Sequence, residues 1–147
     1  MGKIMISVVT AVVLIAGGYF TMEYLKQKEK EEQFWKRQEA RVEKYIRYNI
    51  KDVKSITFTN NEVDPMGVPS VDGYINGNKK LDFSASISTT KDFEDKFSCS
   101  GELYDNYVKK PEKSVSEIEK EEKKKTRVVF VLLFSSLLYP ILRKMHW

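Results

Sequence analysis

Few residues in this chain could do chemistry, and they do not gather into a familiar pattern. The 147-residue sequence contains one histidine, His146, and one cysteine, Cys99. A single histidine excludes a multi-histidine metal site and a nucleophile activated by a histidine within the domain. We interpret His146 as an exposed tail residue. Cys99 lies on the apolar side of a predicted strand, which favours a buried, unreactive thiol, and a lone cysteine excludes an internal disulfide.

The acidic residues give equally little support for catalysis. Asp92, Glu94 and Asp95 fall in one predicted loop, but they lack the spacing of a calcium-binding loop. Asp64 and Asp72 could form a carboxylate pair, although both lie beside predicted turns, where aspartate is common. The seven glycines are scattered and form no phosphate-binding loop. We therefore predict no catalytic, cofactor-binding or metal-binding residue and a protein that is not an enzyme.

The composition is that of a folded domain with apolar ends. Charged residues make up 31% of the chain, hydrophobic residues 41% and aromatic residues 12%, which argues against wholesale disorder. The net charge of +4 comes largely from Lys3, Arg143 and Lys144, which lie near the two ends. The middle is therefore nearly neutral, and we predict no nucleic-acid partner.

The first apolar segment, Ile4–Phe20, carries no charge. We predict that residues 1–22 form a transmembrane anchor that is not cleaved, because bulky Tyr19 and Phe20 follow the small residues that a signal peptidase would need. The orientation stays open. The basic residues that follow the segment favour a cytoplasmic middle domain, whereas the very short N-terminal tail is typical of an export signal.

The middle region, residues 23–108, predicts an α+β domain. Strong helix formers followed by apolar residues at spacings of three and four indicate one long amphipathic helix over Met22–Asn49. Its aromatic residues Trp35, Tyr45 and Tyr48 are predicted to face the core of the domain or the sheet. From Val53 the apolar period changes to two, and Asn76-Gly77 is a strong hairpin signal.

Four strands follow from this alternation, the last through Phe97, Cys99, Gly101 and Leu103. One polar and one apolar face per strand indicates a four-stranded antiparallel sheet, covered on one side by the helix. The open face is the candidate binding surface, and it is predicted to carry Thr57, Thr59, Ser84, Ser86 and Ser88.

The C-terminal part is predicted to be a charged linker or tail, residues 109–127, and a second apolar segment, residues 128–147. Ser114 and Glu117 have the spacing of a helix-capping box, while the charged run Glu119–Lys125 is typical of solvated, disordered chain. Val128–Leu142 would be about 22 Å long as a helix, which is marginal for a span. Membrane spanning, insertion at an interface with the basic cluster on anionic headgroups, and a tail without an evolved role all stay open.

The sequence resembles a family of small Gram-positive, mainly staphylococcal, proteins of unknown function, which have a membrane anchor or lipoprotein signal followed by one cystatin-like domain. The resemblance covers the chain from the anchor to about Lys125. The residues that carry it are Phe34-Trp35, Arg41–Tyr45, Val53–Phe58, Asn61, Pro65–Gly67, Asp72–Asn76, Leu81–Phe83 and Val115–Glu119. It implies a cystatin-like fold and a domain outside the cell, and it supplies no activity, because the family has no assigned one. The chain lacks the cysteine of a lipoprotein signal, and Val128–Trp147 is foreign to the family plan.

Together these observations predict a membrane-anchored cell-envelope protein with a small extracytoplasmic α+β binding or interaction domain. The expected partners are the lipid bilayer and an unidentified protein or envelope component, and no cofactor is expected. The alternative is a protein with two membrane spans whose domain acts in the cytoplasm as an effector or interaction module.

Overall fold

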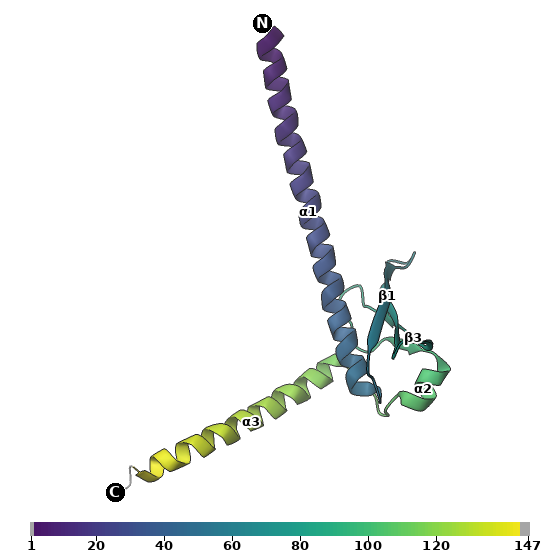
Figure 1. Cartoon of the computed structure of the whole chain (residues 1–147), viewed down its shortest axis with the longest axis vertical. Helices are drawn as coiled ribbons and strands as arrows, with labels where there is room; N and C mark the ends of the chain where they lie inside the picture. Colours follow the sequence, from purple (N-terminus) through teal and green to yellow (C-terminus); the bar gives the residue numbers. More distant parts are fainter. Residues whose placement is uncertain (1, 145–147) are drawn as a thin grey trace. The chain divides into compact units, whose positions relative to one another are not determined.

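The computed structural model describes the backbone of residues 2–144 and the side chains of residue 13 and residues 17–134. This part of the chain forms three helices and four strands (Figure 1). In order they are α1 (Gly2–Asn49), β1 (Ile56–Val63), β2 (Pro69–Ile75), β3 (Asn78–Ser86), β4 (Phe97–Cys99), α2 (Gly101–Tyr107) and α3 (Val115–Lys144). The chain divides into two compact units, Met1–Arg37 and Gln38–Trp147.

The first unit is helical. Its C-terminal part consists mainly of lysine, glutamate and glutamine, which favour a helix even when fully solvated. Thr21 donates its hydroxyl to the carbonyl oxygens of Gly17 and Gly18 at 3.0 and 2.9 Å. Near the end of the unit, the rings of Phe34 and Trp35 meet edge to face with their centroids 5.1 Å apart.

The predicted transmembrane helix of residues 1–22 is wrong. Within the described residues, no helix has a stretch that is both long enough and apolar enough to cross a membrane. In α1 the described apolar residues are followed at once by the charged Glu23. In α3 the apolar stretch with described side chains is Val128–Phe134. As a helix this stretch is about 10 Å long, whereas the hydrocarbon core of a membrane is about 30 Å thick. Most side chains of Ile4–Phe20, and those of residues 135–142, lie outside the described residues.

The second unit contains the sheet, whose strands are antiparallel neighbours in the order β1-β2-β3-β4. The predicted hairpin at Asn76-Gly77 is confirmed, with φ angles of 58° and 69° that match the tight turn expected of this dipeptide. The Asn76 side chain also accepts hydrogen bonds from the backbone N–H groups of Lys54 and Ser55, at 2.7 and 3.2 Å, so it fixes the entry into β1.

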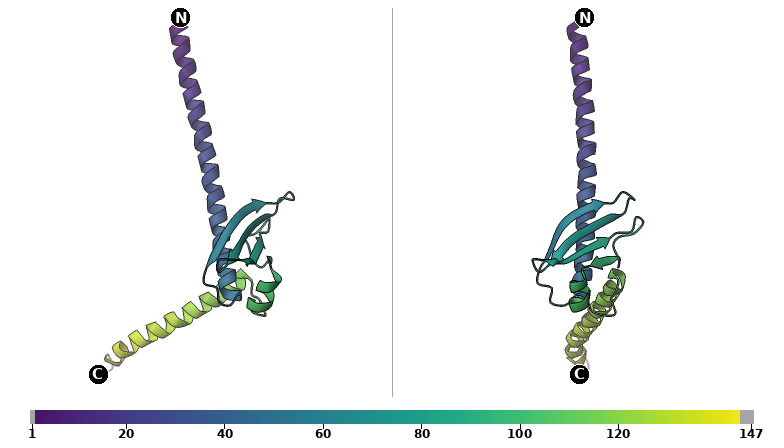
Figure 2. Two further views of the ribbon diagram at one scale, coloured as in Figure 1. Left: turned by 45° about the vertical axis from the view of Figure 1, so that its right-hand side comes forward. Right: turned by 90° about the vertical axis from the view of Figure 1, so that its right-hand side faces the viewer.

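One face of the sheet is covered by the C-terminal part of α1, as predicted (Figure 2). The helix contributes residues at spacings of three and four, and the strands contribute alternate residues, which is the pattern of a helix packed on a sheet. These side chains are buried: Val42, Tyr45, Ile46, Val71, Ile75, Leu81, Phe83 and Ala85. The fold is therefore α+β with four antiparallel strands.

The fourth strand is shorter than its alternation predicts. It ends at Cys99, and α2 begins at Gly101, so Leu103 is buried from a helix and not from a strand. Ser100 stands immediately before the helix and Glu102 lies in its first turn, both of which favour a helix start. In the sequence the alternation of apolar residues continues to Leu103 because Leu103, although it belongs to α2, is buried and lies an even number of residues after Cys99.

The predicted linker and tail, residues 109–127, are also corrected, because they are folded onto the second unit. Asn49 exchanges two hydrogen bonds of 2.9 Å with the backbone of Lys113, and Val115 and Ile118 are fully buried. The capping box is confirmed: the backbone N–H of Ser114 donates to the Glu117 carboxylate at 2.9 Å. The charged run that follows is helical within α3.

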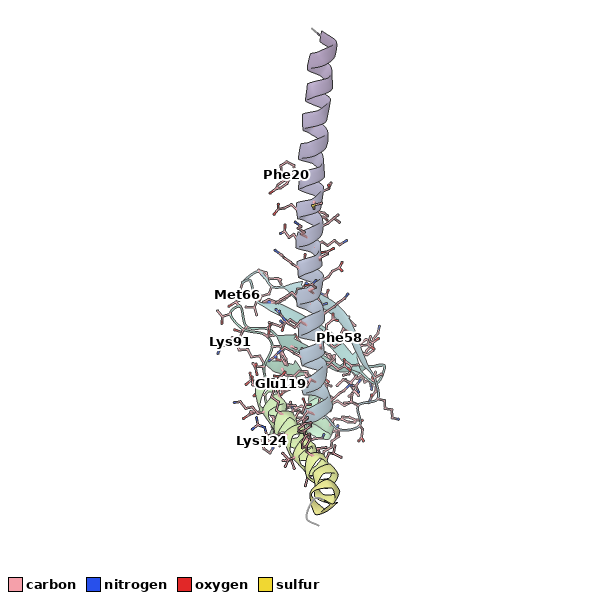
Figure 3. The ribbon with its side chains drawn as sticks, turned by 90° about the vertical axis from the view of Figure 1, so that its left-hand side faces the viewer. Phe20, Phe58, Met66, Lys91, Glu119 and Lys124 are labelled. Carbon is pink, nitrogen blue, oxygen red and sulfur yellow. The ribbon has the colours of Figure 1, made fainter. Side chains whose placement is uncertain are left out.

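Ion pairs hold the start of α3 against α1. Glu119 lies 3.6 Å from Arg41, and Glu122 lies 3.0 Å from Lys44. Figure 3 shows Glu119 on the part of α3 nearest α1, with Lys124 farther along the helix. Exposed ion pairs contribute little individually, so the buried Val115 and Ile118 account for most of the stability of this contact.

Candidate functional site

The open face of the sheet carries the polar side chains of alternate strand residues. Directly opposed residues of antiparallel strands share a face. Tyr74 of β2 pairs with Asp82 of β3, and Asp72 pairs with Ser84, which in turn pairs with Ser98 of β4. The right-hand view of Figure 2 shows the sheet in front of α1, so this open face is turned toward the reader.

A shallow hollow of about 720 Å³ lies on this face. Its wall has both polar and apolar surface and comes mainly from β2, β3 and β4, with one residue from the β1 edge. The residues that line it are Thr59, Asp72, Gly73, Tyr74, Lys79, Asp82, Phe83, Ser84, Ser98, Cys99 and Ser100. The hollow thus combines two carboxylates, one phenol ring, one ammonium group and several hydroxyl groups.

Asp72 has the most unusual environment in the hollow. Its Oδ1 atom is buried and has no hydrogen-bond partner among the described residues. A buried carboxylate oxygen without a donor is unfavourable by about 1–3 kcal/mol or more. Next to it the pairing of β1 with β2 shifts between Phe58 and Asn60, and Thr59 there donates its hydroxyl to the Asp72 carbonyl oxygen at 3.2 Å. The bulge turns the β1 edge at the point where Asp72 faces outward.

The charges of the hollow are not balanced. Asp72 and Asp82 lie diagonally across β2 and β3, and Lys79 is the basic residue that lines the same hollow. Ser100 is held in place by two hydrogen bonds: its hydroxyl donates to the Lys80 carbonyl oxygen at 2.7 Å, and its N–H donates to the Asp82 carbonyl oxygen at 3.1 Å. The site therefore presents a fixed, mildly acidic polar surface.

Cys99 borders the hollow. It pairs with Phe83 on the apolar side of the sheet, and its side chain is half-buried. Burial, followed by the negative charges of Glu112 and Asp82, raises the pKa of the Cys99 thiol above its ordinary value. Because the thiolate is the nucleophilic form, these surroundings agree with the inert thiol that the sequence predicts.

The other predicted candidates do not meet at one place. Asp92 accepts a hydrogen bond of 2.7 Å from Gln38, and Glu94 pairs with Arg41 at 2.5 Å, so these loop carboxylates join elements of the fold. Asp64 accepts the N–H groups of Met66 and Val68, both at 2.8 Å, in the β1–β2 turn and forms no pair with Asp72. Within the described residues, no group of three or more histidine, cysteine or carboxylate side chains could hold a metal ion. His146 lies outside them.

The helix aromatics Trp35, Tyr45 and Tyr48 differ in burial, and Tyr45 is the one of the three that lies in the core. Tyr45 is buried against Phe93, and its hydroxyl donates to Glu112. Burial and the Glu112 carboxylate raise the pKa of Tyr45 above its ordinary value, so its hydroxyl stays protonated. Tyr48 donates to Glu121 at 2.6 Å. Trp35 is half-buried in the first unit.

The sequence pattern predicts the open polar face of the sheet but not the residues that line the hollow on it. The sequence places Asp72 beside a predicted turn, whereas in the structure it occupies the middle of β2, where Val71, Gly73 and Ile75 alternate with it. That alternation already places Asp72 and Tyr74 on the open face. Two predicted members are not regular strand positions: Thr59 falls in the bulge, and Ser88 follows the end of β3.

Comparisons with known proteins give a family and one fold relative. The model of the family described as "Protein of unknown function (DUF1433)" matches residues 34–120, more than half of the chain. A solution NMR structure of the folded 79-residue fragment of Lin0334 from Listeria innocua is 37% identical, with a TM-score of 0.50, and the match covers 60% of this chain and 94% of that fragment. No curated protein matches the chain. The family match begins at Phe34, so the resemblance predicted for the N-terminal segment is not part of it.

Proposed function

The chain belongs to the DUF1433 family of proteins of unknown function, and from that premise we propose that its domain is a non-enzymatic interaction module that binds a basic segment of a partner protein on the open face of the sheet. The observation that carries the proposal is the buried, unpartnered Oδ1 atom of Asp72 in the wall of the hollow. A guanidinium or ammonium group of the partner supplies the missing donor.

The surroundings of Asp72 favour an extended basic segment over other ligands. Asp82 adds a second carboxylate on the next strand, and the Tyr74 ring lies on the same face, where it can stack against a guanidinium plane. The serine hydroxyls of β3 and β4 can bond to backbone groups of an extended chain. The hollow is shallow and runs across three strands, which suits a peptide better than a small enclosed ligand.

Asp72→Asn tests the proposal without disturbing the fold. A fluorescent short peptide of alternating arginine and serine is the probe, and its anisotropy is measured against the full chain at low salt. We expect D72N to weaken binding about tenfold or more, since a hydrogen bond to a charged group contributes about 1.5–3 kcal/mol. The thermal stability of D72N should equal or exceed that of the wild type, because the change removes an unpaired carboxylate.

Asp105→Asn is the matched control, because Asp105 is exposed on α2 and does not line the hollow. It removes the same charge and should leave the affinity unchanged. A peptide with glutamate in place of arginine should not bind. Equal binding by D72N and D105N, or amide chemical-shift changes confined to residues outside the hollow, would refute the proposed site.

We also propose the finer parts of the fold and location that the sequence suggested. A single helix across a four-stranded antiparallel meander supports a cystatin-like domain. The family resemblance supports a location outside the cytoplasm in a Gram-positive cell. We predict that protease added to intact protoplasts degrades the domain. Survival of the domain until the cells are lysed would show that the location is wrong.

A further inference from the structure

α3 changes character along its length, outside the surface discussed above. Its first turns pack on the domain through Val115 and Ile118, which are fully buried. From Val128 to Phe134 every residue is apolar, and every one is between 54% and 63% exposed. This exposed apolar segment, residues 128–134, contains the phenylalanines Phe130 and Phe134, whose ring centroids lie 5.5 Å apart on one side of the helix.

The apolar segment has no polar side. Successive residues of a helix are rotated by about 100°, so Val128, Val129, Phe130 and Val131 together cover its whole circumference. A helix that is apolar all round needs an apolar environment on every side. A protein groove or a second helix covers one stripe, whereas lipid acyl chains can surround the segment.

A basic cluster stands immediately before this segment. It consists of Lys123, Lys124, Lys125 and Arg127, all exposed. In the part of the chain that the structure describes, none of these four residues makes an ion pair. The nearby acidic residues are already paired: Glu119 with Arg41 at 3.6 Å, Glu121 with Lys113 at 2.5 Å and Glu122 with Lys44 at 3.0 Å. Lys125 also interacts electrostatically with Glu121. The four basic residues of the cluster therefore keep an excess of positive charge that this one interaction does not offset.

The basic cluster and the apolar segment also meet at a surface hollow. This hollow of about 750 Å³ lies where α3 leaves α1, and it is lined by Lys44, Glu119, Glu122, Lys123, Thr126, Arg127 and Phe130. It places two basic side chains of the cluster next to the first phenylalanine of the segment. An anionic lipid matches this arrangement, because its negatively charged headgroup is joined directly to an apolar acyl chain.

We propose that residues 123–134 bind the surface of an anionic membrane, with the basic cluster at the level of the lipid phosphates and Val128–Phe134 inserted among the adjoining acyl chains. The described apolar segment is about 10 Å long, which fits insertion by about 5–10 Å into one leaflet. This contact is independent of the open sheet face, so the domain can bind a partner and a membrane surface at the same time.

A local fluorescent label tests the proposal in the full chain. V131C, labelled with an environment-sensitive dye in a C99S background, reports on the apolar segment alone and is unaffected by the N-terminal part of the chain. With vesicles of mixed phosphatidylglycerol and phosphatidylcholine, we expect blue-shifted, brighter emission that weakens as salt is added. The same dye at K91C, in an exposed loop of the domain (Figure 3), should not respond.

The basic cluster is tested by charge removal. The variant K123Q/K124Q/K125Q/R127Q should bind anionic vesicles more weakly by roughly 600-fold, since each of the four basic residues near such a surface contributes about fivefold. K51Q/K54Q/K80Q/K96Q removes the same charge from exposed positions elsewhere in the domain and should have little effect on the label at V131C.

Three results would overturn the proposal. The first is no response at V131C to anionic vesicles, and the second is an equal response to pure phosphatidylcholine. The third is a blue shift without vesicles that grows with protein concentration, which would make a second copy of the chain the occupant of the apolar segment.

Discussion

Gly73→Ala will lower the free energy of unfolding by about 3 kcal/mol, the upper part of the usual range for overpacking. A Cβ atom at position 73 would lie 2.3 Å from the backbone oxygen of Thr57 and 2.7 Å from Cζ of Phe83. The Phe83 ring can turn by a small amount, but the Thr57 carbonyl belongs to the paired β1 strand and cannot move without breaking that pairing.

The reason for this constraint is an aromatic row across the buried face of the sheet. Gly73 pairs with Phe58 on one side and with Phe83 on the other. The rings of Phe58 and Phe83 meet edge to face at 6.2 Å, and Phe83 stacks on Phe97 at 5.5 Å. Glycine leaves the space that the Phe83 ring crosses, which is the usual role of a glycine in the interior of a strand.

Gly101→Ala is the control for Gly73→Ala, because nothing lies within 4 Å of a Cβ built at position 101 and the residue begins α2. It should leave stability unchanged or raise it slightly, since alanine favours a helix. Urea denaturation of both variants gives the comparison. Equal midpoints for G73A and wild type would mean that β1 and β2 can separate at this point at little cost.

The sheet could be predicted because its signals are local. The alternation of Leu81, Phe83 and Ala85 gives one buried face, and Asn76-Gly77 allows only a tight hairpin. The open face follows from the same period, which is why the polar face of the sheet could be predicted from the sequence. An aspartate next to a glycine is typical of a turn, but Asp72 lies between Val71 and Gly73 in the middle of a strand.

The start of α3 could not be predicted because its partners are distant in sequence. In isolation, Glu119–Lys125 is a run of charges with no apolar period, and such a run is usually solvated. Its glutamates are placed by Arg41, Lys44 and Lys113, and the backbone before it is held by Asn49. Only the tertiary structure brings these groups together.

Ile118→Ala will lower the free energy of unfolding by about 3 kcal/mol, as expected for a large-to-small change at a fully buried site. Among the described side chains of α3, Ile118 and Val115 are the fully buried ones. The change therefore opens a cavity where the start of α3 packs on the domain. A disordered tail would make the same substitution silent. The experiment therefore distinguishes a docked helix from the solvated tail that the charge pattern suggests.

Lys120→Ala is the control for Ile118→Ala, because Lys120 is exposed on the same turn of α3 and makes no ion pair among the described residues. Its effect should stay within about 0.5 kcal/mol, as is usual for a surface substitution. Both changes leave the ion pairs of Glu119 and Glu122 in place. If I118A and K120A unfold at the same urea concentration, α3 is not docked on the domain through its buried face. The ion pairs with Arg41 and Lys44 would then be the remaining contact, and exposed ion pairs contribute little to stability.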